Sequence, residues 1–133
     1  MDRSTAENLL QNSPFHQFLG IKFEGYERGN VILNIPFRKE FLVNPEMGII
    51  HGGIISSVLD IAGHYAIFSM VGSKSPTTNL CVDYLSPATT SDLMVQASVI
   101  KIGSSIGVAD MTLYHPEEPK KNIAVGRATY KHK

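Results

Sequence analysis

The stretch of sequence that decides the fold is His51–Val71, HGGIISSVLDIAGHYAIFSMV. Its apolar residues recur at the three- and four-residue spacing of a helix, and they form a stripe so wide that other elements must cover most of it. Gly72 and the polar segment after it end the pattern. We therefore predict a long, largely buried helix that begins near His51 and carries one carboxylate, Asp60, in its middle.

Strand-like segments lie on both sides of this helix. Before it, residues 20–36 alternate apolar and polar side chains around the turn sequence ERGN, which is typical of a β-hairpin. A short helix over residues 4–12, opened by a capping box of Ser4 and Glu7, precedes the hairpin. Four further segments of strand composition, separated by turn signals, follow the long helix: 77–85, 92–103, 105–115 and 121–132. This order predicts an α+β fold in which one antiparallel sheet of about five to six strands wraps around the central helix.

Length and composition limit the kinds of partner that we expect. The 133 residues fit a single domain, residues 1–133, which can bury a core without metal ions or disulfides. Acidic and basic residues balance at twelve each, which argues against nucleic acid, because phosphate binding needs a basic surplus. Cys81 is the only cysteine and lies in an apolar strand, so we predict a core residue in a reducing compartment. Neither a signal peptide nor an uninterrupted membrane span is apparent, so we expect a cytoplasmic protein without membrane contact.

His51, Gly52 and Gly53 open the predicted helix, and they suggest a place for an oxyanion. The first amides of a helix have no internal partner and carry partial positive charge, and glycine lets another group approach them closely. A carbonyl oxygen or a developing oxyanion would fit there. Alternatively, the glycines only let the helix pack tightly under the sheet. At the cap position, a ring hydrogen bond of His51 would orient the turn, with acid–base catalysis as the alternative.

Asp60 needs either a partner or a function, because an unpaired buried carboxylate costs several kcal/mol. A carboxylate in an apolar cleft suits the work of a general base or nucleophile. Two structural explanations are the alternatives to a catalytic role: Asp60 could lie on a narrow solvent-exposed side of the helix, or it could form an ion pair with His64 at i+4. Ser56 and Ser57, together with His51 and Asp60, contain the residue types of a hydrolase triad, but there is no strained Gly-x-Ser-x-Gly turn. Two ligand-type residues on one helix make a poor metal signal, so we expect no metal.

These motifs together resemble the hotdog-fold acyl-CoA thioesterases, specifically the phenylacetate-pathway type and the animal acyl-CoA thioesterases near it. The matching features are Asp60 nine residues after His51 and the motifs GIIHGG (48–53), DYLSPA (83–88), KIGS (101–104) and AVGRATY (124–130). The resemblance covers nearly the whole chain. It implies an acyl-CoA thioesterase that needs no cofactor, since coenzyme A is part of the substrate.

The resemblance also implies roles for individual residues. Asp60 would activate the hydrolytic water or attack the thioester directly, the Gly52 amide would polarise the thioester carbonyl, and Thr77 would help to hold the water. His51 and Asn44 would complete this catalytic set. Asn44 lies seven residues before the histidine where relatives have six, so either the loop bulges or Asn44 has lost the role. Substrate and CoA binding would involve Gly53, Thr78, Lys101, Ser104 and Arg127.

The spacing of Asp60 and Gly52 predicts a site shared between two chains. Eight residues of helix correspond to about 12 Å along the axis and about 80° around it, so the two groups of one chain cannot both contact one thioester. An isologous dimer sets Asp60 of one chain against Gly52 of the other. We therefore expect a homodimer, and by the resemblance a tetramer of two dimers. The alternatives are a non-catalytic acyl-CoA-binding hotdog module and a hotdog dehydratase or hydratase, whose local motif is absent.

Overall fold

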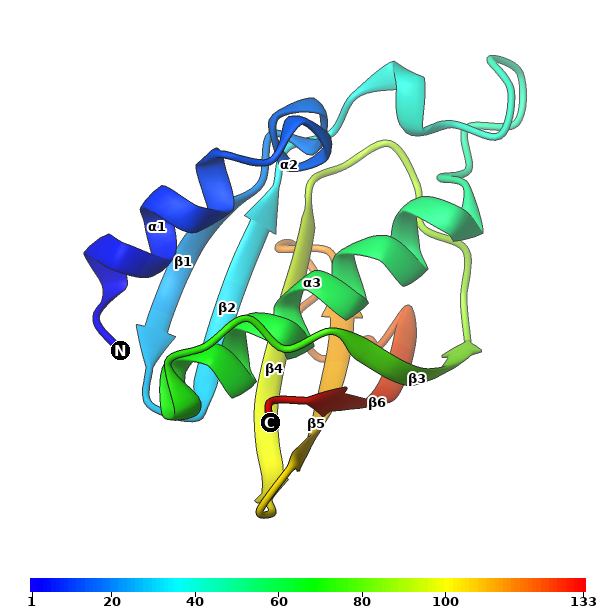
Figure 1. Ribbon diagram of the computed structural model, residues 1–133. Helices are drawn as coiled ribbons and strands as arrows, with labels where there is room; N and C mark the ends of the chain where they lie inside the picture. The colour runs from blue at the N-terminus through cyan, green and yellow to red at the C-terminus, as the bar shows by residue number, and fades with distance from the viewer.

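A computed structural model describes residues 1–133. The chain begins with two short helices and a β-hairpin, continues into the long helix, and ends with four more strands (Figure 1). In chain order the elements are α1 (Arg3–Gln11), α2 (Pro14–Leu19), β1 (Lys22–Glu27), β2 (Asn30–Ile35), the 3₁₀ turn η1 (Lys39–Phe41), α3 (Gly52–Val71), β3 (Thr77–Tyr84), β4 (Leu93–Ile102), β5 (Ile106–Tyr114) and β6 (Ala124–Lys131).

All six strands form one antiparallel sheet in the order β1-β2-β4-β5-β6-β3. β3 does not pair with its neighbour in sequence but crosses over to pair with β6, so β1 and β3 are the two edges of the sheet. α3 lies across one face of this sheet and contacts every strand from β2 to β6 (Figure 1). The predicted α+β architecture, a curved antiparallel sheet around one long helix, is confirmed.

α3 is bounded by the residues that the sequence indicates. His51 is its N-cap and accepts a hydrogen bond from the Gly53 amide on Nδ1 at 2.8 Å, which is the ring hydrogen bond expected at the cap position. Gly72 ends the helix with a left-handed φ of 72° that favours glycine. Half of the 20 helical residues are buried. α3 is long and apolar enough to cross a membrane, but 56% of its most apolar window is buried inside the molecule, so packing accounts for its composition.

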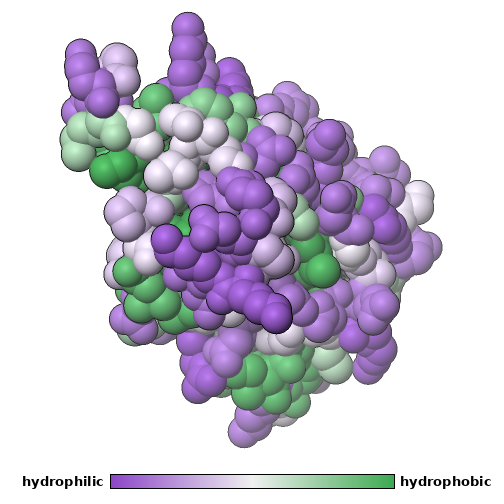
Figure 2. All heavy atoms as spheres, turned by 180° about the vertical axis from the view of Figure 1, so that it is seen from behind, coloured by the Kyte–Doolittle hydropathy of each residue, from purple (hydrophilic) through white to green (hydrophobic).

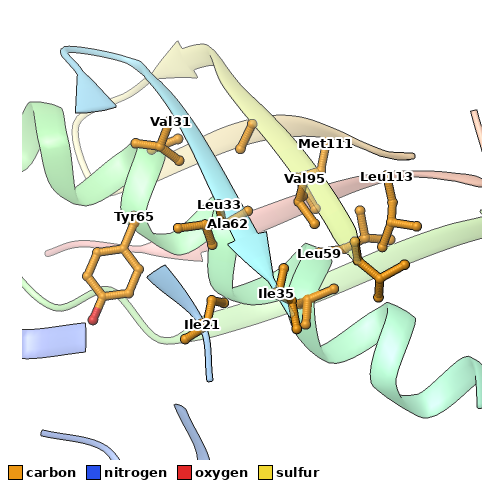
Figure 3. Close-up of a cluster of buried hydrophobic side chains, with 14 of the residues drawn as sticks. Ile21, Val31, Leu33, Ile35, Leu59, Ala62, Tyr65, Val95, Met111 and Leu113 are labelled. Carbon is orange, nitrogen blue, oxygen red and sulfur yellow. The ribbon is translucent and has the colours of Figure 1, made fainter. Parts of the chain in front are cut away.

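One hydrophobic cluster of 29 buried residues fills the space between α3 and the sheet (Figure 3). Leu33 of β2, Val95 of β4 and Met111 of β5 project from the sheet, and Leu59 and Ala62 meet them from α3. Each of the larger side chains contributes roughly 1.5–3 kcal/mol by leaving water. This packing fixes the rotation of α3, and it thereby fixes which side of the helix Asp60 occupies.

Gly63 marks the closest approach of α3 to β6. A Cβ atom at this position would overlap the Tyr130 hydroxyl and would lie 3.0 Å from the sulfur of Met111. We therefore expect Gly63→Ala to lower the free energy of unfolding by about 2 kcal/mol, measured by urea denaturation. Gly25→Ala is the control, since its Cβ would stay at least 3.5 Å from its neighbours. Equal losses in both variants would contradict this account of the packing.

The N-terminal segment differs from the sequence prediction in two details. α1 is capped by Asp2, which accepts the Thr5 amide at 2.8 Å, and not by the predicted box that starts at Ser4. The sequence pattern does not predict α2 (Pro14–Leu19), because Pro14 indicates only the end of the preceding helix. In the structure, Ser13 caps α2 and Pro14 occupies its first turn, where a missing amide hydrogen costs nothing.

Cys81 is exposed, so its predicted place in the core is wrong. It lies on the edge strand β3 opposite Arg127 of β6, on the face of the sheet that points away from α3. Six of the eight β3 residues are exposed, which shows that a strand rich in apolar residues can still be an uncovered edge.

Candidate active site

Asp60 is half-buried where α3 passes the strands β3 and β6. Its Oδ1 accepts a hydrogen bond from the Thr77 hydroxyl at 2.8 Å. The Tyr130 hydroxyl lies 3.1 Å from the same oxygen and 2.8 Å from the backbone carbonyl of Asp60, to either of which it can donate. Oδ2 makes no hydrogen bond. One oxygen of the carboxylate is thus anchored by two strands, and the other is available.

Tyr130 always has a hydrogen to donate to Asp60. Its side chain is fully buried, and burial, followed by the negative charge of Asp60 and the hydrogen bond to it, raises the pKa of Tyr130 far above its usual value. The hydroxyl therefore keeps its proton throughout the working range of an enzyme. No local pattern in the sequence points to Tyr130, which lies 70 residues after Asp60 and only reaches it through the sheet.

A cavity of about 560 Å³ opens beside Asp60, which is within the usual range of small-molecule sites. Three parts of the chain form its wall: α3, the N-terminal segment around α1 and α2, and the loop that leads into β3. The lining residues are Leu9, Asn12, Ser13, His16, Asp60, Ile61, His64, Tyr65, Lys74, Ser75, Pro76 and Thr77. The N-terminal helices therefore belong to the site, which the sequence did not indicate.

His64 does not pair with Asp60, although it follows one helical turn later. Its Nε2 accepts the Ser75 amide at 3.2 Å, which anchors the loop between α3 and β3 two residues before Thr77. Burial lowers the pKa of His64, while the nearby charge of Asp60 acts in the opposite direction. The ring is accordingly neutral near pH 7.

Gly52 lies in a second hollow at the start of α3. Its amide makes no hydrogen bond, whereas its carbonyl accepts the Tyr84 hydroxyl at 3.1 Å. The Gly53 amide is already used by His51, so the Gly52 amide is the free one of the two. The hollow is mainly apolar, and it is lined by Val43, Ile49, Ile50, Gly52, Ile55, Tyr84, Leu85, Ser86, Pro87 and Ala88.

The two hollows have no lining residue in common. Within one chain, the carboxylate of Asp60 and the free amide of Gly52 therefore open onto different spaces. Ser56 and Ser57 do not form a hydrolase triad either, because both hydroxyls donate to the Gly53 carbonyl, at 3.2 and 2.8 Å.

Asn44 and Thr78, two other residues singled out from the sequence, make local hydrogen bonds. The side-chain oxygen of Asn44 accepts the amides of Glu46 and Met47 at 3.1 and 2.9 Å, which closes the turn before α3. Asn44 lines neither hollow. The Thr78 hydroxyl donates to the backbone carbonyl of Thr129 at 3.2 Å, and Thr78 does not line the Asp60 cavity.

The residues predicted to contact coenzyme A lie apart from the Asp60 cavity. Lys101, at the end of β4, and Ser104, in the β4–β5 turn, are exposed. Arg127 is on the outer face of the sheet, where its Nε and an Nη atom donate to the two carboxylate oxygens of Asp110 at 2.6 and 3.0 Å. Figure 2 shows the molecule from behind the view of Figure 1, and this face is largely hydrophilic with separate hydrophobic patches.

Comparisons with known proteins agree with this architecture. A family model described as Thioesterase superfamily matches residues 47–121. A putative esterase of Halobacterium salinarum is 36% identical over 124 residues, which cover 86% of this chain and 81% of that protein. The medium/long-chain acyl-CoA thioesterase YigI of Escherichia coli is 29% identical over 140 residues, which cover 94% of this chain and 89% of that protein.

A solved structure is also similar to this chain in its three-dimensional fold. The Escherichia coli PaaI protein from the phenylacetic acid degradation operon matches with a TM-score of 0.87 at 24% identity, over 98% of this chain and 91% of that chain. This likeness confirms the predicted hotdog fold, and the family model together with the Halobacterium relative confirms the predicted family resemblance. Since the family model covers more than half of the chain and the Halobacterium relative spans most of it, the chain belongs to the thioesterase superfamily.

Proposed function

We propose that the protein is an acyl-CoA thioesterase, which hydrolyses an acyl-CoA to the free acid and coenzyme A. The observation that carries the proposal is the Asp60 carboxylate, whose Oδ1 is held by Thr77 while Oδ2 is free beside a substrate-sized cavity. A carboxylate held in this way can take a proton from water or attack a thioester carbon. The acyl-CoA class is supported by YigI, whose name describes that activity.

Two courses of hydrolysis use the same free oxygen of Asp60. As a general base, Oδ2 takes a proton from water while the water oxygen attacks the thioester carbon; the C–S bond then breaks and the sulfur leaves, protonated, as the coenzyme A thiol. As a nucleophile, Oδ2 attacks the carbon itself, the C–S bond breaks, and the coenzyme A thiolate leaves and takes a proton from solvent. Water then hydrolyses the resulting mixed anhydride, which releases the free acid and restores the Asp60 carboxylate. In either course, the Thr77 hydroxyl holds the carboxylate in place and lies where it can help to position the water.

Hydrolysis also needs a donor for the oxyanion that develops on the thioester oxygen. The free amide of Gly52, at the positive end of a 20-residue helix, is suited to this role. Because it opens onto a different hollow from Asp60, we propose that each site combines Asp60 of one copy with Gly52 of a two-fold related copy.

The surface next to Gly52 supports such a dimer. β3 is an unpaired sheet edge of eight residues, which is a ready template for another chain. Tyr84 and Leu85, at its end, are 55% and 56% exposed and line the Gly52 hollow. A second copy that covers this region would remove apolar surface from water and would bring the two halves of each site together.

The same arrangement gives coenzyme A a route into the site. Its slender pantetheine arm would enter between the two copies and leave the phosphates outside, near basic residues. Lys101, Ser104 and Arg127 are the candidates for that contact, and Arg127 would have to exchange Asp110 for a phosphate. His51 and Gly53 would support the oxyanion donor by fixing the first turn of α3. A tetramer of two dimers is the larger assembly that we propose.

Hydrolysis of a panel of acyl-CoAs, with short, long and aromatic acyl groups, tests the proposed activity through the release of free thiol. Steady release from at least one member is the expected result. Tight binding of acyl-CoAs without thiol release would instead favour a non-catalytic binding module.

Thr77→Ala is expected to lower kcat by about tenfold, which corresponds to one hydrogen bond to a charged group. KM should change little, because a hydroxyl that positions the carboxylate and water acts mainly in the transition state. Thr77→Ser is the matched control, since it keeps the hydroxyl and should retain most of the turnover. A rise in KM with unchanged kcat would instead make Thr77 a residue for substrate binding.

A further inference from the structure

Two histidines in the Asp60 cavity have no role in the hydrolysis proposed above. His16 of α2 and His64 of α3 both line the cavity, and each packs edge-on against the ring of Tyr65, with centroids 6.4 and 4.8 Å away. Each imidazole has one nitrogen bound to the backbone and one without a protein partner. The two free nitrogens are not sealed in the interior, because no buried side-chain nitrogen or oxygen lacks a partner.

The backbone contact of His64 determines which of its nitrogens carries the proton. The Ser75 amide donates to Nε2 at 3.2 Å, so Nε2 bears no hydrogen. Burial lowers the pKa of His64, so the ring is neutral and its single proton is on Nδ1. His64 therefore offers the cavity a hydrogen-bond donor.

His16 has the same Nδ1–H tautomer, but in this ring the protonated nitrogen is the one that meets the backbone. Its Nδ1 lies 2.8 Å from the carbonyl oxygen of Leu10, which can only accept, so Nδ1 carries the proton. In the neutral ring, Nε2 is left with a lone pair. The two histidines that line the cavity beside Asp60 thus have one unused donor, on His64, and one unused acceptor, on His16.

We propose that His64 and His16 together bind a hydroxyl group on the acyl part of the substrate, so that the enzyme prefers hydroxyacyl-CoAs. This proposal rests on the proposed thioesterase function and names a substrate class for it. A hydroxyl oxygen accepts from Nδ1–H of His64, and its hydrogen is donated to Nε2 of His16. A methyl group would leave both nitrogens unpaired, and a carboxylate would bring its own lone pairs against that of His16.

The position of His64 also sets the distance between the hydroxyl and the thioester. His64 lies one helical turn beyond Asp60, about 6 Å along the axis. The thioester carbon must lie at Asp60, so the hydroxyl would be a few bonds further along the acyl group, as it is in 5-hydroxypentanoyl-CoA. Leu9 and Ile61 line the same cavity and give the intervening carbons an apolar wall.

The test compares 5-hydroxypentanoyl-CoA with hexanoyl-CoA, in which a methyl group replaces the hydroxyl. We expect kcat/KM for 5-hydroxypentanoyl-CoA to be about tenfold or more higher than for hexanoyl-CoA, because hexanoyl-CoA cannot form the two hydrogen bonds to the histidines. A ratio near one, or a preference for hexanoyl-CoA, would overturn the proposal. So would a preference for glutaryl-CoA, which ends in a carboxylate, over both.

Two variants remove the free nitrogen of each ring while keeping its contact with the backbone. The amide oxygen of His64→Gln can still accept from Ser75, and the amide nitrogen of His16→Asn can still donate to Leu10. Each variant should reduce the ratio of the two kcat/KM values to near one. His64→Asn is the control: it keeps a donor near the Nδ1 position and loses the contact with Ser75, so the ratio should persist while turnover of both substrates falls. A persistent ratio in both His64→Gln and His16→Asn would overturn the assignment of these residues.

Binding measurements separate this proposal from the thioesterase activity. Calorimetric titration of the same two CoA esters gives the ratio of their Kd values without any need for hydrolysis. A protein that binds both esters, hydrolyses neither, and still favours the hydroxylated one by about tenfold would contradict the proposed activity but support the hydroxyl site. Equal Kd values together with equal kcat/KM values would overturn the hydroxyl site and leave the thioesterase proposal intact.

Discussion

Asp60→Asn is expected to lower kcat for acyl-CoA hydrolysis by about 100-fold or more, because the reaction loses its general base or nucleophile. The side chain keeps its shape, and its amide oxygen can still accept from Thr77 and Tyr130, whose donors lie 2.8 and 3.1 Å away in the parent protein. The anchoring contacts should therefore survive, and the change falls on the free oxygen. Thiol release at saturating substrate measures the effect.

Glu24→Gln is the matched control for this exchange. It makes the same change from carboxylate to amide, but at an exposed position on β1, the sheet edge opposite to β3. It should leave both activity and melting temperature close to those of the parent. Turnover by folded Asp60→Asn within a few-fold of the parent would show that Asp60 does not carry the chemistry.

The parts of the fold that could be predicted from sequence are those with strong local signals. The wide apolar stripe of α3, with His51 before it and Gly72 after it, defined the helix to within one residue. Alternation and turn residues located the strands, including the hairpin of β1 and β2. These signals come from neighbouring residues, so a single sequence contains them in full.

The contacts that complete the site could not be predicted in this way, because they join distant parts of the chain. Tyr130 reaches Asp60 across 70 residues, and only the pairing of β6 with β3 and β5 brings it there. His16 lies on a helix of six residues that no pattern in the sequence indicates, and it reaches the cavity because its ring packs edge-on against Tyr65 of α3. Cys81 shows the opposite error, since local apolar composition does not reveal that a strand is a sheet edge.

The separation of Asp60 from Gly52 leads to the second large effect, which is recovery of activity from two inactive variants. Asp60→Asn removes the base, and Gly52→Pro removes the proposed donor amide. The structure accepts proline there: the Gly52 amide makes no hydrogen bond, and His51 has φ −59° and ψ 135°, the conformation that a residue before proline prefers. An added Cβ would lie 3.4 Å from the Tyr84 ring, which is close to ordinary contact. Gly52→Ala, which keeps the amide, is the control and should remain active.

If each site is shared, unfolding the two inactive proteins together and refolding them should restore activity. In a mixed dimer, one site combines both lesions, and the other combines the intact Asp60 of one copy with the intact Gly52 of its partner. Random pairing makes about half of the dimers mixed, so roughly a quarter of all sites should recover. A site built within a single chain would carry a lesion in every copy, and no pairing could repair it. A refolded mixture that contains mixed dimers by native mass spectrometry, yet stays as inactive as its parents, would therefore exclude the shared site.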